Sequence, residues 1–260
     1  MTMKKIFFIV IFFSISFLLF AQSRTNVGIE KAEGPAYIFR QADPHSKEIA
    51  LTFDDGPNDP YTTEILDILK KYNAKATFFV VGKNVLKYPQ TVKRMYLEGH
   101  AIGNHTYGHP DLIVKGGLFK MRKEMIETEE IIQDVTGQKP FLFRPPYGSG
   151  GNIEAKNRGY YIIEWSVSAK NGAKDPDPDT IIKNVLLNTR GGSVILCHDG
   201  LRLKNFDRSN MVKALPAIIL YLQSEGYKFV TVPELFNLNP PTPEKNFKVN
   251  GLRRGKPRLK

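Results

Sequence analysis

Short apolar runs alternate with amphipathic segments along most of the chain. The runs end in glycine, proline or polar residues and predict strands at 49–53, 76–81, 101–104, 141–143, 161–165, 194–198 and 228–230. Between them, apolar residues recur at helical spacing and predict helices over 61–72, 88–98, 118–136, 179–188 and 211–225. Strand–helix alternation with short connections predicts a parallel sheet with helices outside it.

About seven such strands favour an α/β fold, a distorted (β/α) barrel that is closed or nearly closed. In that fold the functional groups gather at the carboxyl ends of the strands. An open doubly wound sheet is the alternative. No glycine-rich phosphate loop follows the first strand, so nucleotide binding is not indicated. Asp179 or Thr180 is the expected N-cap of the fourth helix, and glycines are expected at helix ends.

The two ends of the chain do not follow this pattern. Lys4 and Lys5 precede an apolar run over 6–20 and then small or polar residues, which predicts an export signal over 1–23. The run is short for a membrane span, and an uncleaved anchor is the alternative. Residues 24–47 are weakly patterned and are expected to form an N-terminal surface segment. Residues 48–238 then form the main domain, and 239–260 form a basic tail.

Composition and charge narrow the classes of partner. At 260 residues with 42% hydrophobic content, the chain can build a sizeable core. The formal net charge of +11 is concentrated in the tail, which is expected to be a solvated end or to contact an anionic envelope polymer or lipid surface. Export argues against a nucleic-acid partner. The single cysteine, Cys197, cannot form an intramolecular disulfide. Its apolar surroundings indicate a buried core residue rather than a nucleophile.

Two adjacent carboxylates, Asp54 and Asp55, follow the first predicted strand and precede Gly56-Pro57. The side chains of neighbouring residues within a strand point to opposite faces. At the frayed end of a strand, however, two neighbouring side chains can reach into the same cavity. Burying unpaired acids is costly, so a partner must hold them there. Taken alone, the pair is also explained by a surface turn, because Asp-Gly-Pro favours turns.

A second motif follows the third predicted strand, where His105 and His109 come after Asn104. Two histidines at this spacing can aim two ring nitrogens at one point, as zinc sites require. A purely structural pair is the alternative. Together with one strand-end carboxylate, they would supply three protein ligands and leave an open position, which is typical of a catalytic zinc site.

Two further motifs also follow predicted strands. After Arg144, the two prolines Pro145 and Pro146 remove backbone donors and leave the amide of Tyr147 isolated, which suits an oxyanion. Arg144 is expected to hold a carboxylate bidentately, although alone this motif is explained by a rigid turn. His198 ends a later strand and is a candidate proton donor. The alternative is a histidine with a structural role, whose ring hydrogen-bonds to backbone groups.

In this order, the four motifs resemble those of the polysaccharide deacetylase family, the chitooligosaccharide deacetylase homology domain of carbohydrate esterase family 4. The resemblance extends over 48–238. It implies a distorted barrel that removes acetyl groups from N-acetylated or occasionally O-acetylated sugars. It also implies a divalent metal, for which zinc is expected and cobalt and nickel are alternatives. The expected substrate is a polysaccharide that contains N-acetylglucosamine, such as peptidoglycan or another envelope glycan.

The resemblance also implies roles for single residues. The metal ligands would be Asp55, His105 and His109. Asp54 would be the general base, oriented by Arg144, and His198 would be the general acid. The Tyr147 amide would stabilise the oxyanion, and Leu196 would line the pocket for the acetyl methyl group. Trp165 is most simply a core residue, and a pocket wall is its alternative role.

One region departs from the family pattern. Ser168 and Asn171 stand where acids are expected, and Gly172 stands where a tryptophan is expected. A replacement carboxylate could come from Asp175, Asp177 or Asp199; without one, His198 should have a less raised pKa and the optimum should move to lower pH. Three functions therefore stay open: an N-deacetylase, an acetyl ester hydrolase on xylan-like sugars, and a weakened glycan-binding barrel.

Overall fold

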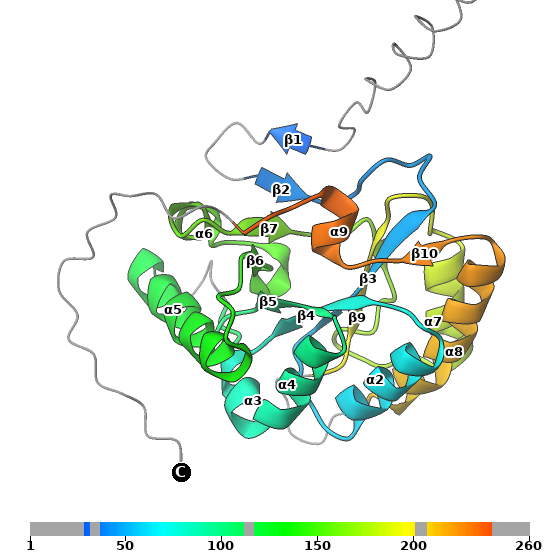
Figure 1. Ribbon diagram of the computed structural model, residues 1–260, viewed down its shortest axis with the longest axis horizontal. Coiled ribbons are helices and arrows are strands. Elements are labelled where there is room, and N and C mark those ends of the chain that lie inside the picture. The colour runs from blue at the N-terminus through cyan, green and yellow to red at the C-terminus, as the bar shows by residue number, and fades with distance from the viewer. Residues whose placement is uncertain (1–28, 32–36, 112–116, 201–206, 241–260) are drawn as a thin grey trace, which may run out of the picture.

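The computed structural model describes residues 29–31, 37–111, 117–200 and 207–240 (Figure 1). The expected export signal over 1–23 and nearly all of the expected basic tail lie outside these residues. Within the described part of the chain, no helix combines the length and the apolar character that crossing a membrane requires.

The strands form one sheet in the order β1-β2-β7-β6-β5-β4-β3-β9-β8, and β10 pairs with β3. From β2 to β8 every neighbouring pair is parallel, and only β1 runs antiparallel to β2. Helices surround this sheet (Figure 1), which confirms the predicted distorted (β/α) barrel. The strands are β1 (Ile29–Lys31), β2 (Tyr37–Phe39), β3 (Glu48–Asp54), β4 (Ala76–Val80), β5 (Ala101–Asn104), β6 (Leu142–Phe143), β7 (Tyr161–Ile163), β8 (Val167–Ser168), β9 (Val194–His198) and β10 (Lys228–Phe229).

The five predicted helices are present with small changes at their ends. Gly99, Gly137 and Gly226 follow three of them in left-handed conformations, as expected for helix C-termini. The expected N-cap at Asp179 or Thr180 is wrong, because Asp177 caps this helix by accepting from the Thr180 amide. The helices are α2 (Tyr61–Lys71), α3 (Gly82–Lys87), α4 (Pro89–Leu97), α5 (Gly117–Thr136), α6 (Asn152–Asn157), α7 (Pro178–Leu186), α8 (Ser209–Ser224) and α9 (Val232–Phe236), together with a 3-10 turn over Pro146–Gly148.

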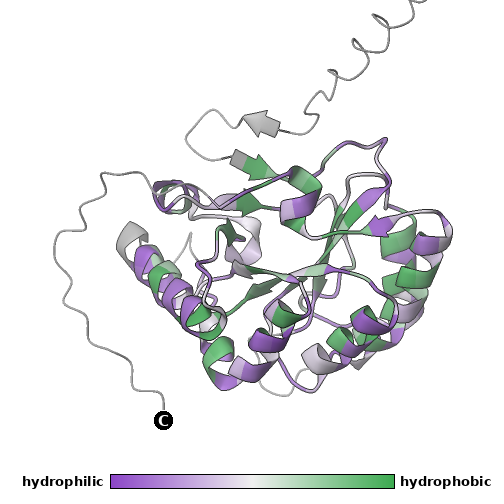
Figure 2. Ribbon diagram, in the orientation of Figure 1, coloured by the Kyte–Doolittle hydropathy of each residue, from purple (hydrophilic) through white to green (hydrophobic). Residues whose placement is uncertain are grey.

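The core lies on both faces of strand β3. After the exposed Glu48, every residue of this strand is buried, as is usual for a parallel strand covered by helices. Phe53 stacks on Phe78 of β4, with ring centroids 5.2 Å apart. In Figure 2 the strands are mostly green, whereas the outer helices carry purple residues as well. Polar residues at the ends of these strands therefore sit on a rigid frame.

Strand β2 was not predicted, because the segment before Glu48 is weakly patterned. It pairs in parallel with β7. Phe39 is 5% exposed and packs edge-on against Tyr161 and Phe236. This part of the N-terminal segment therefore belongs to the sheet.

Candidate metal and catalytic site

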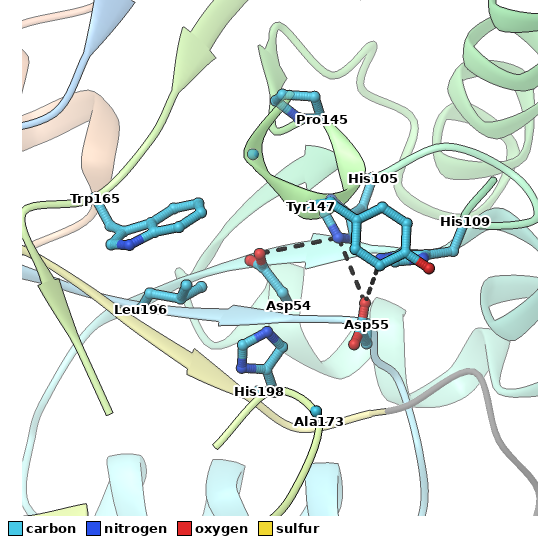
Figure 3. A pocket seen from close by; sticks show the side chains of 12 residues that line it. Asp54, Asp55, His105, His109, Pro145, Tyr147, Trp165, Ala173, Leu196 and His198 are labelled. Atoms are coloured by element: carbon cyan, nitrogen blue, oxygen red, sulfur yellow. Dashed lines mark ion pairs between the residues drawn. The ribbon is translucent and has the colours of Figure 1, made fainter. Parts of the chain in front are cut away.

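A cavity of about 440 Å³ lies at the carboxyl ends of the parallel strands and brings all four sequence motifs together (Figure 3). The fold explains this convergence, because the carboxyl ends of parallel strands meet at one face of a barrel. The residues that line the cavity are Asp54, Asp55, His105, His109, Pro145, Tyr147, Gly148, Trp165, Gly172, Ala173, Leu196 and His198.

The two adjacent carboxylates reach the same cavity because the backbone changes conformation between them. Asp54 is the last residue of β3, whereas Asp55 has φ 74°, in the left-handed region. This region is uncommon for residues other than glycine, but aspartate adopts it more readily than most. The change interrupts the strand alternation that would send the two side chains to opposite faces. Asp54 is 3% exposed and Asp55 is 6% exposed, so both acids are buried.

His105 and His109 aim their Nε2 atoms at the same oxygen of Asp55. The distances to Asp55 Oδ1 are 3.4 Å from His105 and 3.1 Å from His109. The loop that carries them has left-handed residues at Thr106 and His109. It is fixed by Asn104, whose Oδ1 accepts from the Thr106 amide, and by Thr106 Oγ1, which accepts from the His109 amide.

The tautomer of His105 follows from its second ring nitrogen. His105 Nδ1 lies 2.7 Å from the carbonyl oxygen of Arg144, to which it donates. Its Nε2 lone pair is therefore left for the cavity, as in metal-binding histidines held by a carbonyl behind them. This contact also ties the histidine motif to the arginine motif.

Asp55, His105 and His109 fit a divalent cation. Their ligand atoms all lie within 4.8 Å of one another. Asp55 Oδ1 is buried and has no hydrogen bond among the described residues, so it lacks the partner that a buried acceptor normally has. Two imidazole nitrogens and one carboxylate, with the cavity on their open side, are the donor set of a catalytic metal site.

The electrostatics of the three residues support the same reading. Burial disfavours the charged form of Asp55, but the two imidazoles outweigh burial and lower the pKa of Asp55 below its usual range. Burial likewise disfavours the charged form of His105, but Asp54 and Asp55 outweigh it and raise the pKa of His105. Asp55 therefore favours its charged form, and positive charge beside Asp54 and Asp55 is stabilised, as the charge of a bound cation would be.

Arg144 holds Asp54 away from this group. Its Nη1 donates to Asp54 Oδ1 at 2.7 Å, and Arg144 is fully buried. The expected bidentate grip on the carboxylate is wrong, because the guanidinium spreads its other hydrogen bonds over Thr52 Oγ1 and the carbonyls of Ile163 and Glu164. Asp54 therefore keeps Oδ2 on the cavity side, 3.9 Å from His105 Nε2.

Tyr147 forms the rim of the cavity beside the histidines. It lies in the 3-10 turn with φ 59° and ψ 16°. The residue is 61% exposed, and its ring meets the His109 ring edge-on with centroids 4.9 Å apart (Figure 3). Because Pro145 and Pro146 have no N–H, the Tyr147 amide is the first backbone donor after Arg144.

His198 lines the same cavity as Asp55, His105 and His109. It ends β9 and pairs in register with Asp54 of β3. Burial lowers the pKa of His198 to about 4, and the nearby Asp54 and Asp55 only partly oppose this effect. Its Nδ1 lies 3.1 Å from Asn171 Oδ1, so an amide occupies the place behind the imidazole.

None of the three proposed replacement carboxylates hydrogen-bonds to the His198 ring. Asp175 lies behind Asn171, with its Oδ1 3.4 Å from Asn171 Nδ2. Asp177 caps α7, and Asp199 accepts from Thr62 Oγ1. Ser168, the other position where an acid was expected, accepts from the Lys170 amide, so it only stabilises a local turn.

Leu196 and Trp165 give the cavity an apolar wall. Leu196 is 5% exposed and lines the cavity from β9. Trp165 is partly exposed and also lines the cavity, which favours a pocket wall over the simpler interpretation as a core residue. It packs so closely on Gly148 that a Cβ there would lie 2.8 Å from the indole. Cys197 is fully buried, as expected, and burial raises the pKa of its thiol.

Two residues that shape the site were missed by the sequence analysis. Thr52 accepts from Arg144 and donates to the Ile195 carbonyl, yet it looked like any β-branched strand residue. Arg208 is fully buried beside the loop that carries Asn171. Its burial could not be anticipated, because no predicted element or motif included it.

Comparisons with known proteins agree with this arrangement. The polysaccharide deacetylase family model matches residues 41–160. A peptidoglycan-N-acetylglucosamine deacetylase of Bacillus cereus is 44% identical over 206 residues, which cover 77% of this chain and 72% of the relative. A peptidoglycan-N-acetylmuramic acid deacetylase of Bacillus subtilis is 41% identical over 194 residues, but these cover only 39% of that relative.

A solved structure shows the same fold at substantial identity. The crystal structure of the Bc1960 peptidoglycan N-acetylglucosamine deacetylase superposes with a TM-score of 0.73 at 40% identity, covering 79% of this chain and 94% of that one. The sequence motifs, the barrel and the relatives agree. This chain belongs to the polysaccharide deacetylase family and is a hydrolase of that family.

Proposed function

We propose that the protein is an exported, metal-dependent N-deacetylase that hydrolyses the acetamido group of N-acetylglucosamine units in an envelope polysaccharide, with peptidoglycan as the substrate. The observation that carries this proposal is the pairing of unlike carboxylates in one cavity. Asp55 faces His105 and His109, whereas Asp54 is held by Arg144. A site of this kind separates metal binding from proton transfer.

We assign the cation to Asp55, His105 and His109 and expect zinc, with cobalt and nickel as alternatives. Zinc bound there would supply a Lewis acid for the amide carbonyl and would lower the pKa of water. Two neutral nitrogens and one carboxylate leave a net positive charge at the bound cation, which favours the negative charge that develops during amide hydrolysis.

The chain's own residues would perform the proton transfers. Asp54 would accept a proton from the attacking water through the oxygen that Arg144 leaves free. Amide hydrolysis adds water across the C–N bond and yields acetate and an amine. The amine leaves poorly unless it is protonated, so His198 would donate a proton to it across the cavity.

Backbone and apolar groups would position the acetyl group. The Tyr147 amide would donate to the oxygen that becomes negative, and the rigid prolines before it would keep it in place. Leu196 and Trp165 would pack against the acetyl methyl group and exclude water from it. The exposed ring of Tyr147 would contact the sugar at the rim.

The relatives support a peptidoglycan substrate, because one is a peptidoglycan-N-acetylglucosamine deacetylase and another is a peptidoglycan-N-acetylmuramic acid deacetylase. An acetyl ester hydrolase on xylan-like sugars would use the same residues and is the alternative. The signal predicted over 1–23 supports export, and the basic tail is proposed to contact an anionic envelope surface.

The test is acetate release from a substrate panel. The zinc-loaded protein is incubated with purified peptidoglycan, N-acetylglucosamine oligomers and acetylated xylan, and the modified sugar is identified by mass spectrometry. Acetate from peptidoglycan with glucosamine formation supports the proposal. Formation of muramic acid would show that N-acetylmuramic acid, and not N-acetylglucosamine, is deacetylated. Acetate from xylan alone would show that the protein is an acetyl ester hydrolase. Acetate from none of them, despite bound zinc, would support a glycan-binding barrel.

A further inference from the structure

The ring nitrogen of His198 that faces away from the substrate contacts a neutral amide. Asn171 is fully buried and places its Oδ1 3.1 Å from His198 Nδ1. Its Nδ2 already has two acceptors, the His198 carbonyl at 3.2 Å and Asp175 Oδ1 at 3.4 Å. An amide has one donor side and one acceptor side. Because the donor side is occupied, only the acceptor side is available to the imidazole.

Asp175 is fixed in turn by the start of α8. Its Oδ2 accepts from the backbone amides of Asn210 and Met211, both at 3.0 Å. Its side chain is 6% exposed and lies 3.8 Å from Arg208 Nη1. Two backbone amides at a helix N-terminus and a nearby guanidinium hold a carboxylate firmly. Asp175 is therefore a fixed acceptor for the Asn171 amide.

Arg208 ties together the two segments that flank the imidazole. Its guanidinium donates to the Gly200 carbonyl, just after His198, and to the carbonyls of Asn171 and Gly172. Gly172 packs on the ring, since a Cβ there would lie 3.2 Å from His198 Cε1. Gly172 therefore packs against the Cε1 side of the imidazole, and Asn171 contacts its Nδ1.

We propose that Asn171 is a positioning residue that keeps the proton of neutral His198 on Nδ1 and turns Nε2 toward the substrate, and that Asp175 sets the orientation of the Asn171 amide. The proposal rests on the proposed role of His198 as general acid. His198 lines the cavity and its Nδ1 is engaged by Asn171, so Nε2 is the ring nitrogen that takes up a proton from solvent. The imidazolium formed in this way would give that proton from Nε2 to the leaving amine and return to the neutral Nδ1–H tautomer.

The other charged groups around His198 do not replace this contact. Asp54 and Asp55 face it from the end of β3, His105 from the end of β5, and Arg208 from the segment before α8. These groups act on the imidazole through space, and Arg208 and His105 disfavour its charged form. An amide adds no charge, so it orients the ring without stabilising the imidazolium as a carboxylate would.

The test is the tautomer of His198, measured by ¹⁵N NMR on zinc-loaded protein with labelled histidine. Wild-type protein should show neutral His198 with its proton on Nδ1. Asn171→Ala should lose this single tautomer, and Asp175→Asn should weaken it. Asn184→Ala is the matched control, because Asn184 donates to the nearby Ala169 carbonyl without touching His198, and it should leave the tautomer unchanged.

A second readout uses charge. Asn171→Asp puts a carboxylate against Nδ1, so it should raise the pKa of His198 and move the alkaline limb of kcat/KM upward by at least about one pH unit. A proton on Nε2 in the wild type, or an unchanged pKa in Asn171→Asp, would overturn the proposal. The tautomer is measured without substrate, so absence of acetate release would refute the proposed function alone.

Discussion

Arg144 provides the sharpest test of how the site is held together. We expect Arg144→Met to destabilise the protein strongly, because the buried Asp54 would lose its cation and the Phe79 ring would lose the guanidinium that lies over it. Breaking a buried ion pair by removing one partner costs about 3–5 kcal/mol. The contacts to Thr52 and two carbonyls add roughly 1 kcal/mol each at most.

The expected loss is therefore about 3–8 kcal/mol in the free energy of unfolding, a large part of the stability of an ordinary domain. The assay is equilibrium unfolding in urea, read by circular dichroism. Arg94→Met is the matched control, because Arg94 forms ion pairs too, with Asp67 and Glu98, but its side chain is 28% exposed. Exposed pairs contribute little, so the control should lose no more than about 1 kcal/mol.

A double-mutant cycle isolates the ion pair itself. Asp54→Asn removes the charge that Arg144 compensates, so adding it to Arg144→Met should recover about 2 kcal/mol or more. A loss below about 1 kcal/mol in Arg144→Met, or no recovery in the double variant, would refute the reasoning. Either result would mean that Asp54 does not depend on Arg144 for its place in the cavity.

Three further predictions concern the metal, the thiol and a buried acid. His109→Gln should weaken zinc binding, measured by calorimetry, by more than about 100-fold. Even the loss of a residue that only hydrogen-bonds to a metal ligand weakens metal binding about 10- to 100-fold. The control His100→Gln changes a buried histidine away from the site and should leave zinc affinity unchanged. Cys197 should react with a thiol reagent only after unfolding, because it is fully buried and burial raises its pKa. Asp199→Asn should change how stability depends on pH in the metal-free protein. Burial raises the pKa of Asp199 to about 7, so its contribution is complete below pH about 4 and is lost as pH rises through about 7. Relative to the variant, the wild type should lose up to about 4 kcal/mol across that window.

Each of these has a clear contrary outcome. Equal zinc affinities of the two histidine variants would remove His109 from the metal site. Labelling of the native thiol at the rate of a free cysteine would contradict its burial. Parallel stability curves for the wild type and Asp199→Asn would show that this carboxyl group is not held neutral by its surroundings.

The strand-end residues of the site were predictable because their signals are local. Asp54, His105, Arg144 and His198 each follow an apolar run, and parallel strands bring such positions to one face. The order of the predicted strands and helices followed from the same pattern, whereas the short elements β1, β2, β8, α3, α6 and α9 were not predicted. Strand β2 was missed because the segment around it is weakly patterned, and its place depends on pairing with β7.

Other features depend on contacts between distant residues. The left-handed backbone at Asp55 decides that two neighbouring acids share one cavity, and nothing in the strand pattern sets it. The donors of Arg144 divide among Thr52 and two carbonyls because those groups surround the guanidinium in the folded state. The contact between Asn171 and His198 spans two loops, so the sequence could suggest the position but not the partner.

The central claim is that Asp54 and Asp55 have separate roles, and one paired measurement tests it most directly. Zinc binding and acetate release from peptidoglycan are measured for Asp54→Asn and Asp55→Asn, which change the same chemical group at adjacent positions. Asp54→Asn should bind one zinc with nearly wild-type affinity and release acetate at least about 100-fold more slowly. Asp55→Asn should lose both properties. Normal acetate release by Asp54→Asn, or tight zinc binding by Asp55→Asn, would contradict the account.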